Sequence, residues 1–382
     1  MATDAFFLSS LAAFFLLLRL TAATGRSQER CGFPAIYNFG DSNSDTGAIS
    51  ATLSEILPPN GESFFGKPAG RNCDGRLIID FAAENLGLPY LSPYLDSVGA
   101  NFRHGANFAT GGSSIRPGGF SPFDLSIQIS QFIQFKARTI ALYNQLSPDR
   151  TMPPFKSGLP RPEDFSKALY TFDIGQNDIG YGLQHGTDDQ VQASFPDILN
   201  KFSDAVELLY KEGARFFWVH NTGPFGCLPY NIIYYSLKPN NLDRNGCVIP
   251  QNELSKEFNR QLKEKVSWLR TKLSQAVFTY VDVYSAKYSV INDAKNLGFV
   301  DPSTFCCGSY YGYHIDCGKK AVVHGTVYGN PCDHPASHIS WDGIHYSQAA
   351  NQWIANRIFT GSFSEPPVPI WGSCRDSSNV RS

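Results

Sequence analysis

Short apolar runs alternate along the chain with longer stretches in which apolar residues recur at intervals of three and four. An unbroken apolar run predicts a strand buried on both faces, and the interval of three and four predicts a helix. The predicted strands span residues 35–39, 168–175, 215–221 and 276–283. The predicted helices span residues 76–87, 125–146, 191–214, 251–273 and 347–358. We expect the third helix to begin near Pro196 and Ser347 to cap the last.

The alternation of buried strands and amphipathic helices predicts an α/β fold, in which helices cover both faces of a parallel sheet. No internal repeat or low-complexity block divides the chain, so a single domain is expected. Ligands of such sheets bind beyond the carboxyl ends of the strands. The residues that directly follow each predicted strand are therefore candidates for a functional site.

The N-terminus has a different pattern from the rest of the chain. An apolar run from Phe6 to Leu18 is followed by small residues through Gly25. The run is too short to span a bilayer comfortably and is typical of a secretory signal. We therefore expect a signal peptide over residues 1–25, with cleavage near residues 23 to 26. An uncleaved anchor would explain the same run.

The 382 residues carry a formal net charge of −2, and 17% of them are charged, as in an ordinary globular protein. The near-neutral balance gives no electrostatic basis for binding nucleic acid or an anionic membrane surface. Beyond the N-terminal run, no segment reaches membrane-spanning length, so no stable membrane span is expected after signal cleavage.

The chain has nine cysteines, including the neighbours Cys306 and Cys307. A zinc site is an alternative, but no paired C-x-x-C unit occurs, and an exported chain favours disulfides. Because nine is odd, at least one thiol lacks an intramolecular partner. Cys374, in a Pro- and Ser-rich segment, is the expected one. Export places the protein in the secretory pathway, with the extracellular space and cell wall or the Golgi lumen as its destination.

Small polar residues crowd the end of the first predicted strand, in NFGDSNSDTG at residues 38–47. A tight turn without chemistry would explain them. The alternative is a turn that presents Ser42 as a nucleophile, in which Gly40 allows the bend and Asp41 and Asp45 brace it. A serine hydroxyl then needs a base, a group that orients the base, and donors for the oxyanion.

The segment SWDGIHYS, residues 340–347, supplies a candidate base. Asp342 and His345 lie three residues apart in a loop just before the last predicted helix. Among the eight histidines, only His345 has an aspartate at this offset in such a loop. At this spacing the carboxylate can bond the imidazole and fix its tautomer. A surface turn with an accidental pair is the alternative.

Two further segments follow apolar runs and offer hydrogen-bond donors. NFATGGSSI, residues 107–115, contains Gly111 and Gly112, where backbone can approach a ligand closely. FDIGQNDIG, residues 172–180, contains the amide of Asn177. Each has a purely structural interpretation, because glycine and Asn-Asp also favour turns. Their shared place at strand ends favours a common site.

Taken in chain order (38–47, 107–115, 172–180 and 340–347), these four segments resemble the GDSL esterase/lipase family, also called SGNH hydrolases, and its plant secreted branch in particular. The resemblance covers residues 31–360, which leaves residues 361–382 as a flexible C-terminal tail. It implies a three-layer α/β/α fold with a flavodoxin-like parallel sheet. Asn43 stands where the family name motif has leucine, a position without a catalytic role.

The resemblance also implies the site residues. Ser42, His345 and Asp342 would form the catalytic triad, and the backbone N–H groups of Ser42 and Gly112 and the amide of Asn177 would form the oxyanion hole. No metal or organic cofactor is required.

The implied activity is that of a serine esterase working through an acyl-enzyme. The expected substrates are O-acetyl esters of cell-wall polysaccharide such as xylan, or of glycosides. The aromatic segments 230–235 and 310–314 would either stack on sugar rings or simply pack. Two alternatives are an acyltransferase that uses the same triad to esterify an alcohol and a catalytically retired carbohydrate-binding protein.

Overall fold

The computed structural model describes residues 30–145, 154–235, 241–310 and 314–374. The expected signal peptide, residues 1–25, lies outside the described residues. The chain divides into two units, Met1–Arg30 and Cys31–Ser382, and the helices and strands named below all belong to the second.

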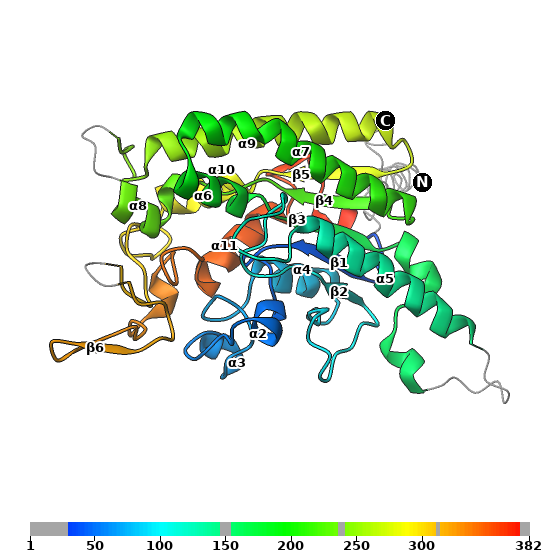
Figure 1. The fold of residues 1–382 in the computed structure, drawn as a ribbon, viewed down its shortest axis with the longest axis horizontal. Helices are drawn as coiled ribbons and strands as arrows, with labels where there is room; N and C mark the ends of the chain where they lie inside the picture. The colour runs from blue at the N-terminus through cyan, green and yellow to red at the C-terminus, as the bar shows by residue number, and fades with distance from the viewer. Residues whose placement is uncertain (1–29, 146–153, 236–240, 311–313, 375–382) are drawn as a thin grey trace, which may run out of the picture. The chain divides into compact units, whose positions relative to one another are not determined.

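A mostly parallel sheet forms the centre of this unit (Figure 1). In the described part of the chain, its strands are β1 (Ile36–Gly40), β2 (Gly105–Asn107), β3 (Leu169–Asp173), β4 (Phe216–His220), β5 (Val277–Val281) and β8 (Ser364–Glu365). Their order across the sheet is β2-β1-β3-β4-β5-β8. Only β8 pairs in the antiparallel sense, with β5. The first five strands thus have the flavodoxin-like order, whose switch point lies between β1 and β3.

Helices cover both faces of this sheet. They are α2 (Ala48–Thr52), α3 (Glu62–Phe65), α4 (Ile78–Leu86), α5 (Leu125–Asn144), α6 (Gln176–His185), α7 (Asp188–Lys211), α8 (Pro229–Tyr235), α9 (Ile249–Lys272), α10 (Val283–Asn292) and α11 (Gln348–Ile358). One series of contacts runs from α5 to α7 to α9, and a second runs from α4 to α11 to α10. Figure 1 shows α7 and α9 running side by side. The predicted three-layer α/β/α fold is confirmed.

Smaller elements complete the unit. A two-stranded antiparallel sheet joins β6 (Ala321–Val323) to β7 (Thr326–Tyr328). Short 3-10 helices span Pro154–Gly158, Pro162–Ser166, Phe225–Cys227, Pro335–Ser337 and Ile370–Gly372.

Strands β1, β3, β4 and β5 form where the apolar runs predicted strands, because their residues are largely buried, whereas β2, β6, β7 and β8 were not predicted. All five residues of β1 are buried, and Phe39 stacks between Phe108 and Phe172. Ser347 caps α11 as expected, since its hydroxyl accepts a hydrogen bond from the backbone N–H of Ala350. Burial and capping together therefore fix these elements.

The predicted start of the third helix near Pro196 is wrong. Helix α7 begins at Asp188, and Pro196 lies inside it. Thr187 and Gln190 form a reciprocal capping box that starts the helix before the proline is reached.

The expectation of a flexible tail over residues 361–382 is also wrong for residues 361–374, because the ordered domain continues to Cys374. Strand β8 pairs with β5, and the backbone N–H of Ile370 donates to the carbonyl of Phe359. The last described residue forms a disulfide with Cys31.

Four disulfides connect eight of the nine cysteines, which confirms the prediction of disulfides. They are Cys31–Cys374, Cys227–Cys247, Cys306–Cys332 and Cys307–Cys317. The expectation that Cys374 is the unpaired residue is wrong: Cys73, buried beside α4, is the free thiol. The four bridges are consistent with a secreted protein. Among the helices of the described residues, none has the length and apolar character needed to cross a membrane.

Candidate active site

The turn after β1 holds Ser42 at the carboxyl edge of the sheet. The chain passes so closely here that a Cβ at Gly40 would lie 2.3 Å from the hydroxyl oxygen of Ser44. The Oδ1 atom of Asp41 accepts hydrogen bonds from both the backbone N–H and the side-chain amide of Asn43, each at 2.9 Å. The turn is therefore fixed on both sides of Ser42.

Asp45 connects this turn to a second loop. Its carboxylate accepts hydrogen bonds from the backbone N–H groups of Gly47, Ala48 and Ile49 at 2.7, 2.6 and 3.0 Å. A fourth donor, the N–H of Gly111, reaches the same carboxylate at 2.8 Å. The loop after β2 is thus tied directly to the serine turn.

Asp342, His345 and Ser42 form a continuous chain of hydrogen-bonding contacts. Nδ1 of His345 lies 2.6 Å from Oδ2 of Asp342, and Nε2 lies 2.8 Å from the hydroxyl oxygen of Ser42. The other oxygen of Asp342 accepts from the backbone N–H of His345 itself, at 2.7 Å. Because Asp342 favours a proton on Nδ1, the neutral ring presents Nε2 as an acceptor to Ser42.

The surroundings of His345 change its affinity for a proton. Burial lowers the pKa of the imidazole, but the charges of Asp342 and Asp41 and the hydrogen bond to Asp342 outweigh burial and raise the pKa above its usual value. The site therefore stabilises an imidazolium, the form that arises when His345 accepts a proton.

The other two predicted site residues come from the loop after β2 and from helix α6. Gly112 follows β2 and has a φ of 78°, in the left-handed region that favours glycine. Asn177 lies in the first turn of α6, and its amide nitrogen donates to the carbonyl of Ser113 at 2.9 Å. Asp178 of α6 holds the helix to the loop after β2, because its carboxylate accepts the N–H groups of Ile115 and Arg116 at 2.8 and 3.0 Å.

Ser42, His345, Gly112 and Asn177 all line one cavity of about 380 Å³. Gly111 also lines it, but its N–H donates to Asp45. The structure thus gathers four chain segments, separated by up to 303 residues, around one cavity.

Much of the cavity wall was not identified from the sequence as part of a site. The apolar wall residues include Ile49, Phe120, Leu183, Phe225, Leu228 and Ile344, and the polar ones include Asn72, Gln176, Gln184 and Asn231. Tyr230 and Tyr235 of α8 and His314 also line the cavity, so the aromatic segments 230–235 and 310–314 were the signals for this side of the wall.

A buried group of charges lies beneath the serine turn and was also missed. Burial, followed by the charge of Asp173, raises the pKa of Asp41 to about 7. Burial alone would also raise the pKa of Asp173. The hydrogen bond and charge of His220, whose Nδ1 lies 3.3 Å from the carboxylate, act with the charge of Lys287 to lower that pKa overall. Burial lowers the pKa of Lys287, although the negative charges of Asp173 and Asp41 act to raise it. Asp41 directly follows β1, Asp173 and His220 are the last residues of β3 and β4, and Lys287 lies within α10, so no shared sequence pattern marks the group.

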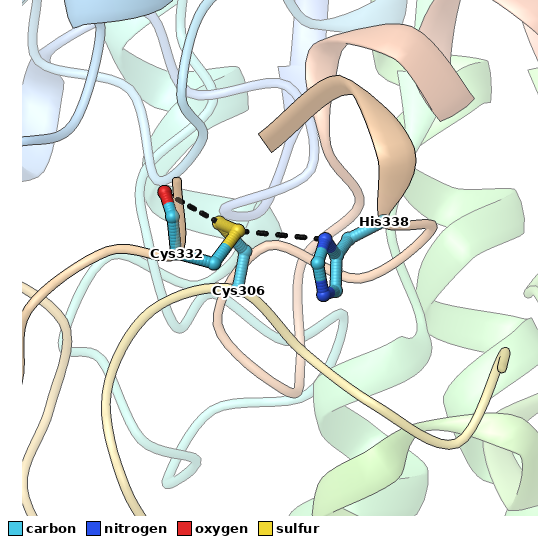
Figure 2. A group of neighbouring side chains, drawn as sticks. All are labelled: Cys306, Cys332 and His338. Atoms are coloured by element: carbon cyan, nitrogen blue, oxygen red, sulfur yellow. Dashed lines mark hydrogen bonds between the residues drawn. A yellow bond between two sulfur atoms is a disulfide. The ribbon is translucent and has the colours of Figure 1, made fainter. Parts of the chain in front are cut away.

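A second cluster has the residue types of a metal site but not the chemistry. Figure 2 shows Cys306, Cys332 and His338 together, with Nδ1 of His338 3.4 Å from the sulfur of Cys332. The two sulfur atoms are bonded to each other in a disulfide. Neither offers the thiolate that a metal ion needs, so the cluster does not fit a metal site.

Known proteins resemble this chain over nearly its whole length. The family model described as GDSL-like Lipase/Acylhydrolase matches residues 36–358. A GDSL esterase/lipase of Arabidopsis thaliana is 54% identical, covering 96% of this chain and 97% of the relative. Alpha-L-fucosidase 3 of Arabidopsis thaliana is 50% identical, with coverages of 93% and 97%. The solved structure of a catalytic variant of an acetylxylan esterase from Geobacillus stearothermophilus is 14% identical, with coverages of 86% and 92% and a TM-score of 0.36. The chain therefore belongs to the GDSL-like lipase/acylhydrolase family and is a carboxylic ester hydrolase.

Proposed function

We propose that Ser42 is the nucleophile of a serine esterase, with His345 as its general base and Asp342 as the group that orients His345. The observation that carries the proposal is the pair of contacts at His345, 2.6 Å to Asp342 and 2.8 Å to Ser42, at the wall of a cavity. These are the hydrogen-bond distances that a nucleophile and its base require.

The reaction proceeds in two halves. His345 takes the hydroxyl proton of Ser42 as the oxygen attacks the ester carbonyl, and it then protonates the departing alcohol. Water, activated by the same imidazole, attacks the acyl-enzyme and releases the acid. The raised pKa of His345 favours the imidazolium that both halves require.

The tetrahedral oxyanion of each half is stabilised by the N–H groups of Ser42 and Gly112 and by the amide of Asn177. All three residues line the cavity that contains His345. Gly112 is favoured over Gly111 as the donor because the N–H of Gly111 already donates to Asp45. Donors that are fixed before the reaction stabilise the charge without reorganising during it.

The proposed substrates are O-acetyl esters of cell-wall polysaccharide such as xylan, or of glycosides. Tyrosine rings and side-chain amides share the cavity wall, represented by Tyr230, Tyr235, Gln184 and Asn231. Rings that stack and amides that both donate and accept hydrogen bonds suit a sugar. A relative named alpha-L-fucosidase agrees with carbohydrate as the substrate class.

The test offers acetylated xylan, acetylated pectin and small glycoside acetates to the wild type and to Ser42→Ala. Acetate released by the wild type alone supports the proposal. Equal release by both proteins would rule out Ser42 as the nucleophile. An acyl donor mixed with candidate alcohols completes the test, since ester product in excess of free acid would identify an acyltransferase instead.

A further inference from the structure

A smaller cavity of about 220 Å³ meets the main cavity at His345. Four residues, Ile56, Asn72, Ile344 and His345, line both cavities. Gly112 and Asn177 line only the main cavity. A group in the smaller cavity would therefore lie beside the imidazole and away from the proposed oxyanion donors.

This position determines which half of an ester can enter. His345 donates its proton to the leaving oxygen, so that oxygen must approach Nε2, and the alcohol attached to it extends past the imidazole. We propose that the smaller cavity is the subsite for the leaving alcohol and that it accepts a polyhydroxylated alcohol such as a sugar residue. This inference rests on the function proposed above.

The charged groups of the smaller cavity suit hydroxyl groups. The carboxylate of Asp316 contacts Nζ of Lys319 at 2.9 Å and Nε2 of His314 at 3.1 Å. Burial alone would raise the pKa of Asp316, but Lys319 and His314 lower it overall, so the carboxylate stays ionised. A carboxylate that accepts and an ammonium that donates match sugar hydroxyls, which do both.

The neighbouring side chains add an aromatic surface and an amide. Tyr310 lines the cavity, with its ring packed so closely on Gly343 that a Cβ there would lie 2.5 Å from the ring. Because Tyr310 is only 5% exposed, its ring fixes the shape of the cavity wall. Asn72, at the junction of the two cavities, makes no hydrogen bond to another described residue and has its amide available for a ligand.

Contacts among described residues hold both ends of the loop that carries Tyr310 and Asp316 before a ligand arrives. The Cys307–Cys317 disulfide closes a loop with a sequence separation of 10. Inside it, Ser309 and Ile315 exchange two backbone hydrogen bonds of 2.8 Å. A rim ordered in advance loses less conformational entropy when it binds a ligand.

The experiment compares two esters of the same acid, phenyl acetate and a mono-acetylated methyl xyloside, so that only the alcohol differs. Lys319→Met is the test variant, and Lys320→Met, next to it but outside both cavities, is the matched control. We expect Lys319→Met to lower kcat/KM for the xyloside ester about tenfold more than for phenyl acetate. Lys320→Met should leave the ratio of the two values unchanged.

Asp316→Asn, which keeps the shape of the side chain and removes its charge, should shift the ratio in the same direction. Free methyl xyloside should also inhibit phenyl acetate hydrolysis competitively in the wild type and more weakly in Lys319→Met. Equal losses on both esters in both variants would overturn the subsite. Ser42→Ala separates the two proposals: if it remains active, the proposed function fails, and if it is inactive while the ratios do not move, only the subsite fails.

Discussion

The carboxylate of Asp45 accepts a hydrogen bond from the backbone N–H of Gly111 at 2.8 Å, although 66 positions separate the two residues. The same carboxylate caps the short helix that follows the serine turn. One buried side chain therefore sets the distance between the proposed nucleophile and the loop that carries the proposed donor Gly112.

Asp45→Asn should lower both stability and turnover. The carboxylate uses both oxygens as acceptors, whereas an amide has only one, so two buried N–H groups lose their acceptor. We expect the free energy of unfolding in urea to fall by about 1–3 kcal/mol and kcat to fall more than KM changes. Asp189→Asn, on the exposed first turn of α7, is the control and should change neither quantity. An unchanged kcat in Asp45→Asn would show that the two loops hold their positions independently.

Asn177→Ala tests the proposed oxyanion hole. Removing one oxyanion donor should reduce kcat by roughly 10²- to 10³-fold with little effect on KM, because the donor acts on charge that develops only in the transition state. Steady-state kinetics with phenyl acetate measures this. The exposed Asn296→Ala is a matched control. A loss confined to KM would assign Asn177 to substrate binding instead.

The sequence predicted the elements whose burial is continuous. Strands β1, β3, β4 and β5 are short apolar runs, and any chain that buries both faces of a parallel strand carries that pattern. Strand β8 has only two residues, Ser364 and Glu365, and forms because it pairs with the edge of β5. No local pattern distinguishes such a pair from a loop, so the ordered C-terminal segment was assigned to a tail.

The residues of the site also fall into two groups, those that a local motif predicts and those that only the whole fold brings together. Its proposed chemical groups lie in short motifs because a turn with fixed geometry needs particular residues at fixed spacing. The cavity wall has no such motif, since Asn72 and Leu183 reach it from loops and helices whose packing is decided by the whole fold. Lys287 illustrates the limit, because it is a buried cation that only tertiary structure places near Asp173.

Removing the disulfide between Cys31 and Cys374 should destabilise the domain. The bridge closes a loop with a sequence separation of 343 and anchors the C-terminal segment beside β5. In the Cys31→Ser, Cys374→Ser double variant we expect a loss of about 2–4 kcal/mol in the free energy of unfolding. Denaturant unfolding measures it. Peptide mapping without reduction should find Cys73 as the free thiol in the wild type, and a different free cysteine there would contradict the pairing.

The last prediction concerns Asp41, whose charge raises the pKa of His345. A general base must be neutral, so kcat/KM should fall as the pH drops through that raised pKa. Asp41→Asn keeps an acceptor for the backbone N–H of Asn43 but carries no charge, so the imidazolium is less stabilised and the pKa of His345 falls. Because Asp41 is ionised only above its own raised pKa of about 7, the acid limb of the pH–rate profile should move to lower pH in Asp41→Asn by less than a permanently charged neighbour would cause, measured as kcat/KM for phenyl acetate against pH. A uniform loss of activity with the limb in place would mean that Asp41 only shapes the turn.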